Sequence, residues 1–302
     1  MPLPVLTTPV PHSVGLNRPQ RQLPPGACDS HMHIFDPRFA PSSHWPRTPP
    51  VASVAVYRQL QARLGTTRTV VVTPSTYGTD NACMLDALDQ LGDAARGVAV
   101  VGEEVSADEL AHLAARRVRG LRVNFVSPQS WGTTTPDMLA TLARKVAEHP
   151  ACTGWHVQIF AHPEQLIVLA PQLRTLPVPL VIDHLGRIDP AEGPAAKAYG
   201  VVRGLLDGGN TWVKLSGAYM RSTMHGPSYA DTLPLGRALV QAAPERLVWG
   251  SDWPHTTETP GTVNDADLVD LLQAWAGSDA AMDRIMVDNP ARLYGFDTAA
   301  PA

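Results

Sequence analysis

The sequence contains little cysteine and no long apolar run. Its three cysteines, Cys28, Cys83 and Cys152, are scattered and form no C-x-x-C pair. We therefore expect reduced thiols in a cytoplasm and not a disulfide framework. No apolar stretch approaches the ~20 residues that a membrane-spanning helix requires, and the first residues lack the basic-then-apolar pattern of a secretory signal. These absences predict a cytoplasmic protein without a membrane partner.

Excess positive charge is also lacking. The formal net charge of the 302 residues is -4, so no global basic field attracts nucleic acid or an anionic membrane. The chain is 44% hydrophobic and only 17% charged, which is typical of a globular protein with a large core. Local arginines remain available for a small anion.

Residues 1–25 have no hydrophobic period and are rich in proline and polar residues. They predict an irregular arm that lies on the surface or on a neighbouring subunit. A homo-oligomer is therefore one of the alternatives. Residues 26–302 predict one domain of alternating strands and helices.

Eight short apolar runs, each rich in residues that favour strands, recur along this domain. They are residues 27–34, 69–73, 97–101, 120–125, 155–160, 179–184, 212–216 and 246–252. Helical apolar spacing occupies intervening segments such as 80–91, 107–116, 136–148 and 233–243. Eight strands with helical crossovers predict an α/β fold of the (β/α)8 TIM-barrel type. An open doubly wound sheet is the alternative, but no G-x-G-x-x-G follows the first strand.

Polar side chains stand at the ends of three of these runs. His31 and His33 are two residues apart on the first strand, so both rings face the same side. His184 ends the sixth run and Asp252 the eighth. Because the carboxyl ends of barrel strands carry the chemistry, we expect the four side chains to form one active site. A lone histidine at a strand end is more often structural, but three histidines and an aspartate at the ends of three strands of one barrel are hard to obtain by accident.

Further polar residues near the strand ends are candidates for contact with a substrate. Arg122 and Arg187 could bind a substrate anion or simply pair with an acidic neighbour, and Tyr77 could belong to a lid. The remaining candidates are Asn124, His156, Gln158, Lys214 and His255.

Four segments carry a resemblance to a known family. They are D-S-H-M-H-I-F from residue 29, V-I-D-H-L-G-R from 181, W-G-S-D-W-P-H from 249 and D-N-P-A-R-L-Y from 288. With G-T-D-N from residue 78, R-G-L-R-x-N-F from 119 and W-H-V from 155, the chain resembles the amidohydrolase superfamily over roughly residues 26–296. Within it, the chain is most similar to a group that acts on lactones.

This resemblance implies a hydrolase that opens a small, carboxylate-bearing lactone. Asp252 would activate water as a general base. His31, His33 and His184 would polarise the lactone carbonyl, and Arg122 and Arg187 would bind a substrate carboxylate. The substrate is then the small anionic partner of the chain.

The resemblance leaves the cofactor open. A two-metal centre of this family needs a bridging carboxylated lysine or a glutamate on strand 4 and a histidine on strand 5, where this chain has Asn124 and Gln158. We therefore expect either no cofactor or one divalent ion, Zn or Mn, held by His31, His33, His184 and Asp252.

Three other functions stay open at this point. An intramolecular lactone isomerase would use a substrate hydroxyl in place of water, although relatives of that kind lack the equivalents of His31 and Asp252. A non-oxidative decarboxylase would need a bound metal. A barrel that merely binds a sugar acid would not need four ionisable groups at one mouth.

Overall fold

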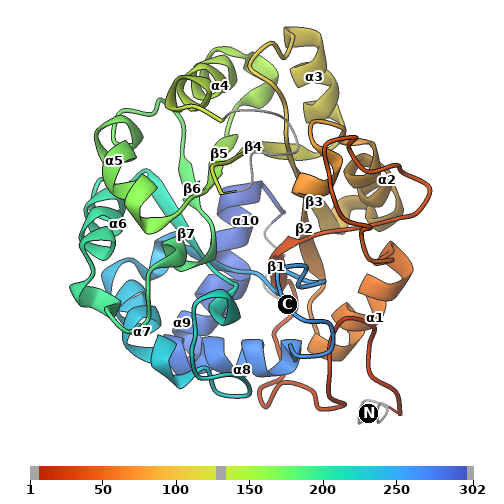
Figure 1. Ribbon diagram of the computed structural model, residues 1–302, viewed down its shortest axis with the longest axis vertical. Coiled ribbons are helices and arrows are strands. Elements are labelled where there is room, and N and C mark those ends of the chain that lie inside the picture. The colour runs from red at the N-terminus through yellow and green to blue at the C-terminus, as the bar shows by residue number, and fades with distance from the viewer. Residues whose placement is uncertain (1–6, 127–133, 298–302) are drawn as a thin grey trace.

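A computed structural model describes residues 7–126 and 134–297 of the chain. Eight parallel strands in sequential order form one sheet, and helices surround it (Figure 1). The strands are β1 Cys28–Met32, β2 Arg68–Val72, β3 Ala95–Ala99, β4 Val118–Asn124, β5 His156–Phe160, β6 Leu180–Ile182, β7 Thr211–Leu215 and β8 Leu247–Trp249. The helices are α1 Val54–Leu64, α2 Ala82–Leu91, α3 Ala107–Ala115, α4 Pro136–Glu148, α5 Pro163–Leu173, α6 Lys197–Asp207, α7 Leu233–Ala242, α8 Asp265–Ala276, α9 Asp279–Asp283 and α10 Asn289–Tyr294.

Backbone hydrogen bonds close the sheet into a barrel. The amide of Asp252 donates to the carbonyl of His31 at 2.7 Å, and the amide of His33 donates to Trp253 at 2.9 Å. Residues just after β8 thus meet β1, which confirms the predicted (β/α)8 barrel.

The eight strands lie inside the predicted runs or within two residues of them, with two instructive differences. β6 ends at Ile182 and β8 at Trp249, before the polar residues that the sequence placed on these strands. His184 and Asp252 both have positive φ angles, 53° and 60°. That conformation is incompatible with a strand and turns the chain at the barrel mouth.

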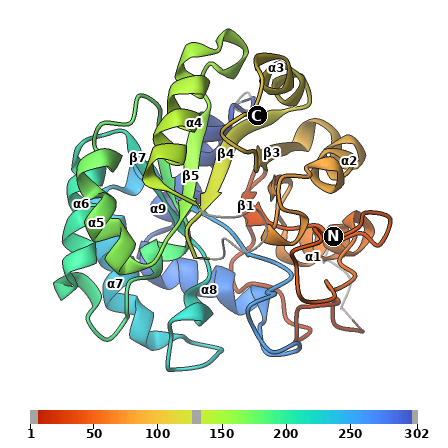
Figure 2. The ribbon, with the colours of Figure 1, turned by 45° about the horizontal axis from the view of Figure 1, so that its top comes forward.

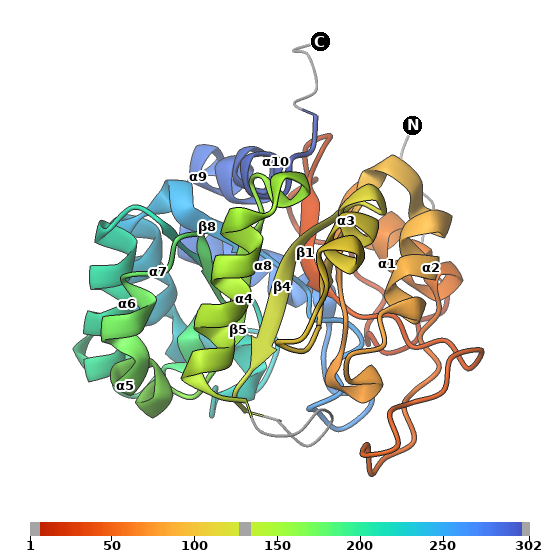
Figure 3. The same ribbon diagram turned by 90° about the horizontal axis from the view of Figure 1, so that it is seen from above.

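Two layers of apolar side chains position the mouth. The first layer lies between the helices and the outside of the sheet. Figure 2 shows these helices flanking the strands. The other fills the barrel interior with valines such as Val70, Val98 and Val248, which pack with Leu293 and Tyr294 of α10. α10 closes the end where the strands begin, while the segments after β1 and β8 lie at the opposite end (Figure 3).

The N-terminal segment lies against the chain's own barrel. Arg63 of α1 donates to the carbonyls of Ser13, Val14 and Asn17, and the Trp253 indole donates to Pro11. Residues 1–6 of the predicted arm lie outside the described residues. Within residues 7–126 and 134–297, no helix has both the length and the apolar character needed to cross a membrane.

Candidate active site

A bulge in β1 turns two histidines into the barrel mouth. Asp29 pairs with Thr69 and Met32 with Val71, so β1 contains one more residue than β2 over this interval. Asp29 faces away from the mouth and accepts a hydrogen bond from Tyr57 of α1 at 2.9 Å. His31, beyond it, lies edge-to-face with His33 at 5.0 Å between ring centroids. The predicted common orientation of the two rings is therefore present, and the bulge separates them from Asp29.

The four residues predicted from the strand ends meet around one carboxylate oxygen. Asp252 Oδ1 lies 3.4 Å from His33 Nε2, 3.5 Å from His31 Nε2 and 3.9 Å from His184 Nε2. All four side chains are buried. The structure thus brings these residues together; their catalytic role stays a prediction.

Partners on the far side of each ring fix its orientation. His33 Nδ1 lies 2.8 Å from the carbonyl of Val72, and because a carbonyl only accepts, Nδ1 carries a proton. His184 Nδ1 lies 2.9 Å from Ser216 Oγ. His31 Nδ1 lies 3.2 Å from Lys214 Nζ and 3.4 Å from Asp183 Oδ1. In all three rings, Nε2 points toward Asp252.

Burial and charge set the protonation of this cluster. Burial lowers the pKa of His31 and that of His184, so both rings are neutral near pH 7. Burial alone would raise the pKa of Asp252, but the three surrounding imidazoles hold it well below its ordinary value. Asp252 is therefore ionised at neutral pH, as a general base must be.

A second buried carboxylate supports the cluster from below. Asp183 Oδ2 accepts from Arg122 Nε at 3.1 Å and from Gln158 Nε2 at 3.1 Å. Lys214 Nζ lies 4.0 Å from Asp183 Oδ1, and burial lowers the pKa of this lysine to about 8. Gln158 and Lys214 have no exposed surface. Gln158 donates to Asp183, and Lys214 contacts the carbonyl of Ser30 and the ring of His31. Both side chains would therefore affect a substrate only through these neighbours.

A cavity of about 80 Å³ opens onto the cluster. His33, His184, Asp252, Arg122 and Asn124 all contribute to its wall. Five of the residues predicted from the sequence thus share one cavity. Asn124 is held there by a hydrogen bond from its Nδ2 to Ser75 Oγ at 2.8 Å.

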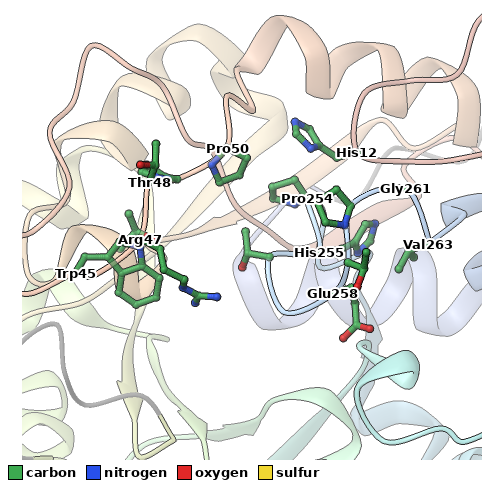
Figure 4. A pocket seen from close by; sticks show the side chains of 15 residues that line it. His12, Trp45, Arg47, Thr48, Pro50, Pro254, His255, Glu258, Gly261 and Val263 are labelled. Atoms are coloured by element: carbon green, nitrogen blue, oxygen red, sulfur yellow. The ribbon is translucent and has the colours of Figure 1, made fainter.

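A larger cavity of about 310 Å³ lies outside the first, and both are bordered by Trp45, Arg47, Thr76 and Thr256. Figure 4 shows the Arg47 side chain pointing into this outer cavity, opposite Glu258. Sequence reasoning missed Trp45 and Arg47 because the segment between β1 and α1 carries no motif. It also missed Tyr219, whose hydroxyl donates to Asp252 Oδ2 at 2.6 Å. Tyr219 follows β7, so its place at a strand end was the available signal.

Four other predicted contacts lie elsewhere. Arg187 lies beside the wall of the inner cavity, with its Cζ atom 5.1 Å from the centre of the Phe160 ring, and it donates to the sulfur of Met220. His156 begins β5 and packs against Tyr294, at the opposite end of the barrel; burial lowers its pKa to about 3. Tyr77 is buried against Phe35 and borders a separate cavity. His255 borders the outer cavity, with its ring bonded to Tyr219 and Asp265.

The cluster also has the donor atoms for one divalent metal ion. His31, His33 and Asp252 form one set whose ligand atoms lie within 4.8 Å of one another, and His31, Asp183 and His184 form a second. Ligand atoms about 2.1 Å from a tetrahedral ion lie about 3.4 Å apart, close to the separations around Asp252 Oδ1. The residues therefore fit a single ion.

Comparisons with known proteins find relatives that match most of the chain. The chain is 35% identical to a 2-pyrone-4,6-dicarboxylate hydrolase of Comamonas testosteroni, over 92% of this chain and 93% of the relative. It is 33% identical to a 4-sulfomuconolactone hydrolase of Hydrogenophaga intermedia, over 90% of both chains. A D-galactarolactone isomerase of Agrobacterium fabrum is 29% identical, over 91% of this chain and 93% of its own length.

The fold has matches among solved structures as well. An Agrobacterium tumefaciens protein in its apo form superposes with a TM-score of 0.85 at 26% identity, over 95% of this chain and 99% of that one. The model of the amidohydrolase family matches residues 28–296. The chain therefore belongs to the amidohydrolase family.

Proposed function

We propose that this chain hydrolyses the ester bond of a small lactone that carries at least one acid group. The observation that carries the proposal is the position of Asp252 Oδ1, which faces the Nε2 atoms of three imidazoles. Asp252 borders a cavity that His33, His184 and Arg122 also line, while His31 lies buried behind it. Two relatives at 35% and 33% identity are named as hydrolases of such lactones, and their names support the same class of substrate.

Asp252 would act as the general base. Its carboxylate is ionised at neutral pH, and Oδ1 faces the cavity while Oδ2 is held by Tyr219. A water molecule beside Oδ1 gives up a proton as its oxygen attacks the lactone carbonyl. Positioned proton transfer of this kind contributes typically 10²–10⁴-fold. When the tetrahedral intermediate collapses, the ring C–O bond breaks and the protonated Asp252 returns its proton to the departing oxygen.

His31 would stabilise the oxyanion of that intermediate. A protonated Lys214 donates to His31 Nδ1 at 3.2 Å, so the ring proton of neutral His31 lies on Nε2 and points into the cluster. An N–H aimed at the developing charge is worth about 10²–10³ in rate. A metal ion bound by His31, His33 and Asp252 would supply Lewis-acid polarisation of the same carbonyl. Asp183 Oδ1, 3.4 Å from His31 Nδ1, would then accept the proton of that nitrogen.

Arg122 would bind the acid group of the substrate. Its guanidinium borders the cavity, and one nitrogen, Nε, is already bonded to Asp183. The remaining N–H groups can hold a carboxylate or a sulfonate and fix the carbonyl over Asp252. Arg47 at the outer rim adds a second positive charge along the path of an entering anion.

Hydrolysis explains the site better than isomerisation. An isomerase must exclude water as a nucleophile, whereas Asp252 borders a cavity that shares four lining residues with a larger outer one. A relative at 29% identity is named as an isomerase, so the product decides between the two reactions.

Proton NMR of the products tests the proposal. Purified protein is treated with EDTA, and half is reloaded with Zn²⁺ or Mn²⁺. Each sample receives 2-pyrone-4,6-dicarboxylate, 4-sulfomuconolactone or D-galactarolactone, with the Asp252→Asn protein as the matched control. We expect an open-chain acid from at least one lactone. Conversion into another lactone ring would replace hydrolysis by isomerisation, and no reaction in any sample would overturn the proposed substrate class.

A further inference from the structure

A row of buried polar side chains leads from Asp252 away from the cavity. The Tyr219 hydroxyl lies 2.6 Å from Asp252 Oδ2, and His255 Nδ1 lies 3.0 Å from the same hydroxyl. His255 Nε2 in turn lies 3.1 Å from Asp265 Oδ2. Tyr219, His255 and Asp265 come from the loop after β7, the loop after β8 and the first turn of α8. All of them are buried.

Each of these three contacts requires one proton, and the donors can be assigned. An ionised carboxylate only accepts, so the phenol donates its single proton to Asp252. The phenol oxygen can then only accept from His255, which places a proton on Nδ1. Asp265 also accepts, which places a second proton on Nε2. His255 is therefore an imidazolium paired with Asp265. Burial alone would lower the pKa of His255, but the charge of Asp265 and its hydrogen bond to the ring raise that pKa above its ordinary value. The raised pKa favours the imidazolium.

We propose that Tyr219, His255 and Asp265 are positioning residues that hold the Asp252 carboxylate with Oδ1 toward the three imidazoles. The terminal torsion of an aspartate has no sharp preference of its own, so its contacts decide where each oxygen lies. A neutral His255 could accept the phenol proton and release Oδ2. The Nδ1–H of His255 prevents this, because it occupies the acceptor side of the phenol oxygen. This role rests on the proposed function of Asp252 as the base.

The first test removes the phenol proton. In Tyr219→Phe, we expect kcat to fall about 10-fold or more, the effect of losing a hydrogen bond to a charged group. KM should change by less than about twofold, because Tyr219 contacts the base and Arg122 holds the substrate. The control is Tyr199→Phe, since the Tyr199 hydroxyl donates to the carbonyl of Ala238 on the outer helices and not to a residue of the cluster.

A matched pair at His255 separates positioning from a structural role. The amide nitrogen of asparagine replaces Nδ1 and can still donate to Tyr219, whereas that of glutamine replaces Nε2 and can only reach Asp265. We expect His255→Gln to lower kcat about 10-fold more than His255→Asn. If His255 merely joins the loop after β8 to α8, the order reverses and glutamine is the better replacement. The reversed order would overturn the proposal.

Asp252→Asn in the same assay keeps the two proposals distinguishable. If Asp252→Asn is active, the proposed base is wrong. If it is inactive while Tyr219→Phe keeps the kcat of the wild type, only the positioning role is wrong. Thermal melts followed by circular dichroism identify any variant that does not fold. Tyr219→Phe decides the question even when a His255 variant is lost.

Discussion

The backbone amide of Asp252 donates to the carbonyl of His31 at 2.7 Å. The hydrogen bond that closes the barrel therefore joins the proposed base directly to a proposed oxyanion donor. The closure also depends on Gly250, because a Cβ at this position would lie 2.5 Å from the Cβ of His31 and 2.7 Å from its backbone nitrogen. Only glycine lets the chain after β8 approach β1 this closely.

Gly250→Ala should therefore damage both stability and activity. Forcing an extra carbon into a packed site destabilises by about 1–3 kcal/mol, which lowers the Tm of a chain of this size by about 2–5 °C. Gly200→Ala is the matched control, because the α6 position has open space around the new methyl group. There, replacing a helical glycine should stabilise by about 0.5–1 kcal/mol. Equal melting temperatures for the two variants would contradict the close approach of β8 to His31.

Asp252→Asn should abolish turnover and preserve substrate binding. The amide cannot accept the proton of water, so we expect kcat to fall about 10²–10⁴-fold, while calorimetric titration gives a similar Kd for the lactone. Asp207→Asn on the surface of α6, where Asp207 pairs with Arg203, is the control. A variant that keeps more than about a tenth of wild-type kcat would remove Asp252 from the role of base.

The strands were predictable because buried parallel strands are almost continuously apolar. The run 120–125, for instance, predicts most of β4, and the spacing over 136–148 predicts α4 with the same bounds. The four central residues followed from one rule, that polar side chains at the carboxyl ends of barrel strands converge. Their mutual distances did not, because the β1 bulge and the positive φ of Asp252 have no sequence signature.

The predicted residues that lie away from the inner cavity and the residues that were missed share a cause. The sequence shows that His255 follows β8, but not that its ring turns toward Asp265. Trp45 and Arg47 reach the mouth on a loop whose path no periodicity specifies. Gln158 lies on β5, as the sequence predicts, yet its amide donates to Asp183 below the cavity and is not left for a substrate. Side-chain direction beyond the strands depends on tertiary contacts that only the structure shows.

Arg122 and Arg187 should differ in their effect on substrate binding. Arg122→Lys keeps a positive charge beside Asp183 but loses the planar fork that holds an acid group. We expect KM to rise about 10-fold or more, the value of a lost charged hydrogen bond. Arg187 lies over Phe160 beside the cavity wall, so Arg187→Lys should raise KM less. Steady-state kinetics on one lactone measure both, and a larger effect at Arg187 would reassign the anion site.

Zn²⁺ or Mn²⁺ should stabilise the EDTA-treated protein. An ion that binds the folded chain at about 100 times its Kd adds about 2.7 kcal/mol, or about 4 °C in Tm for a chain of this length. His33→Asn should lose this rise, because it removes one Nε2 from the cluster. His149→Asn outside the site is the control. Absence of a shift in the wild type would show that the donor set does not hold a metal ion.

The His255–Asp265 pair should make stability depend on pH in a defined direction. Asp265 raises the pKa of His255 above its ordinary value of about 6.5, so the folded chain holds this proton more tightly than the unfolded chain. The stability that the pair adds is then fully present below about pH 6.5 and is lost as pH rises through the folded pKa. The other charged groups near this ring do not reverse the sign, because Asp252 and Asp29 also raise the pKa of His255. The phenol of Tyr219 stays neutral over this range, since burial raises its pKa. The difference in Tm between wild type and Asp265→Asn should therefore be largest near pH 6 and shrink toward pH 9. For Asp207→Asn, which changes a surface ion pair on α6, the difference should stay constant across the same range. A difference for Asp265→Asn that grows with pH would mean that His255 is neutral in the folded chain, and the proton assignment along Tyr219, His255 and Asp265 would have to be reversed.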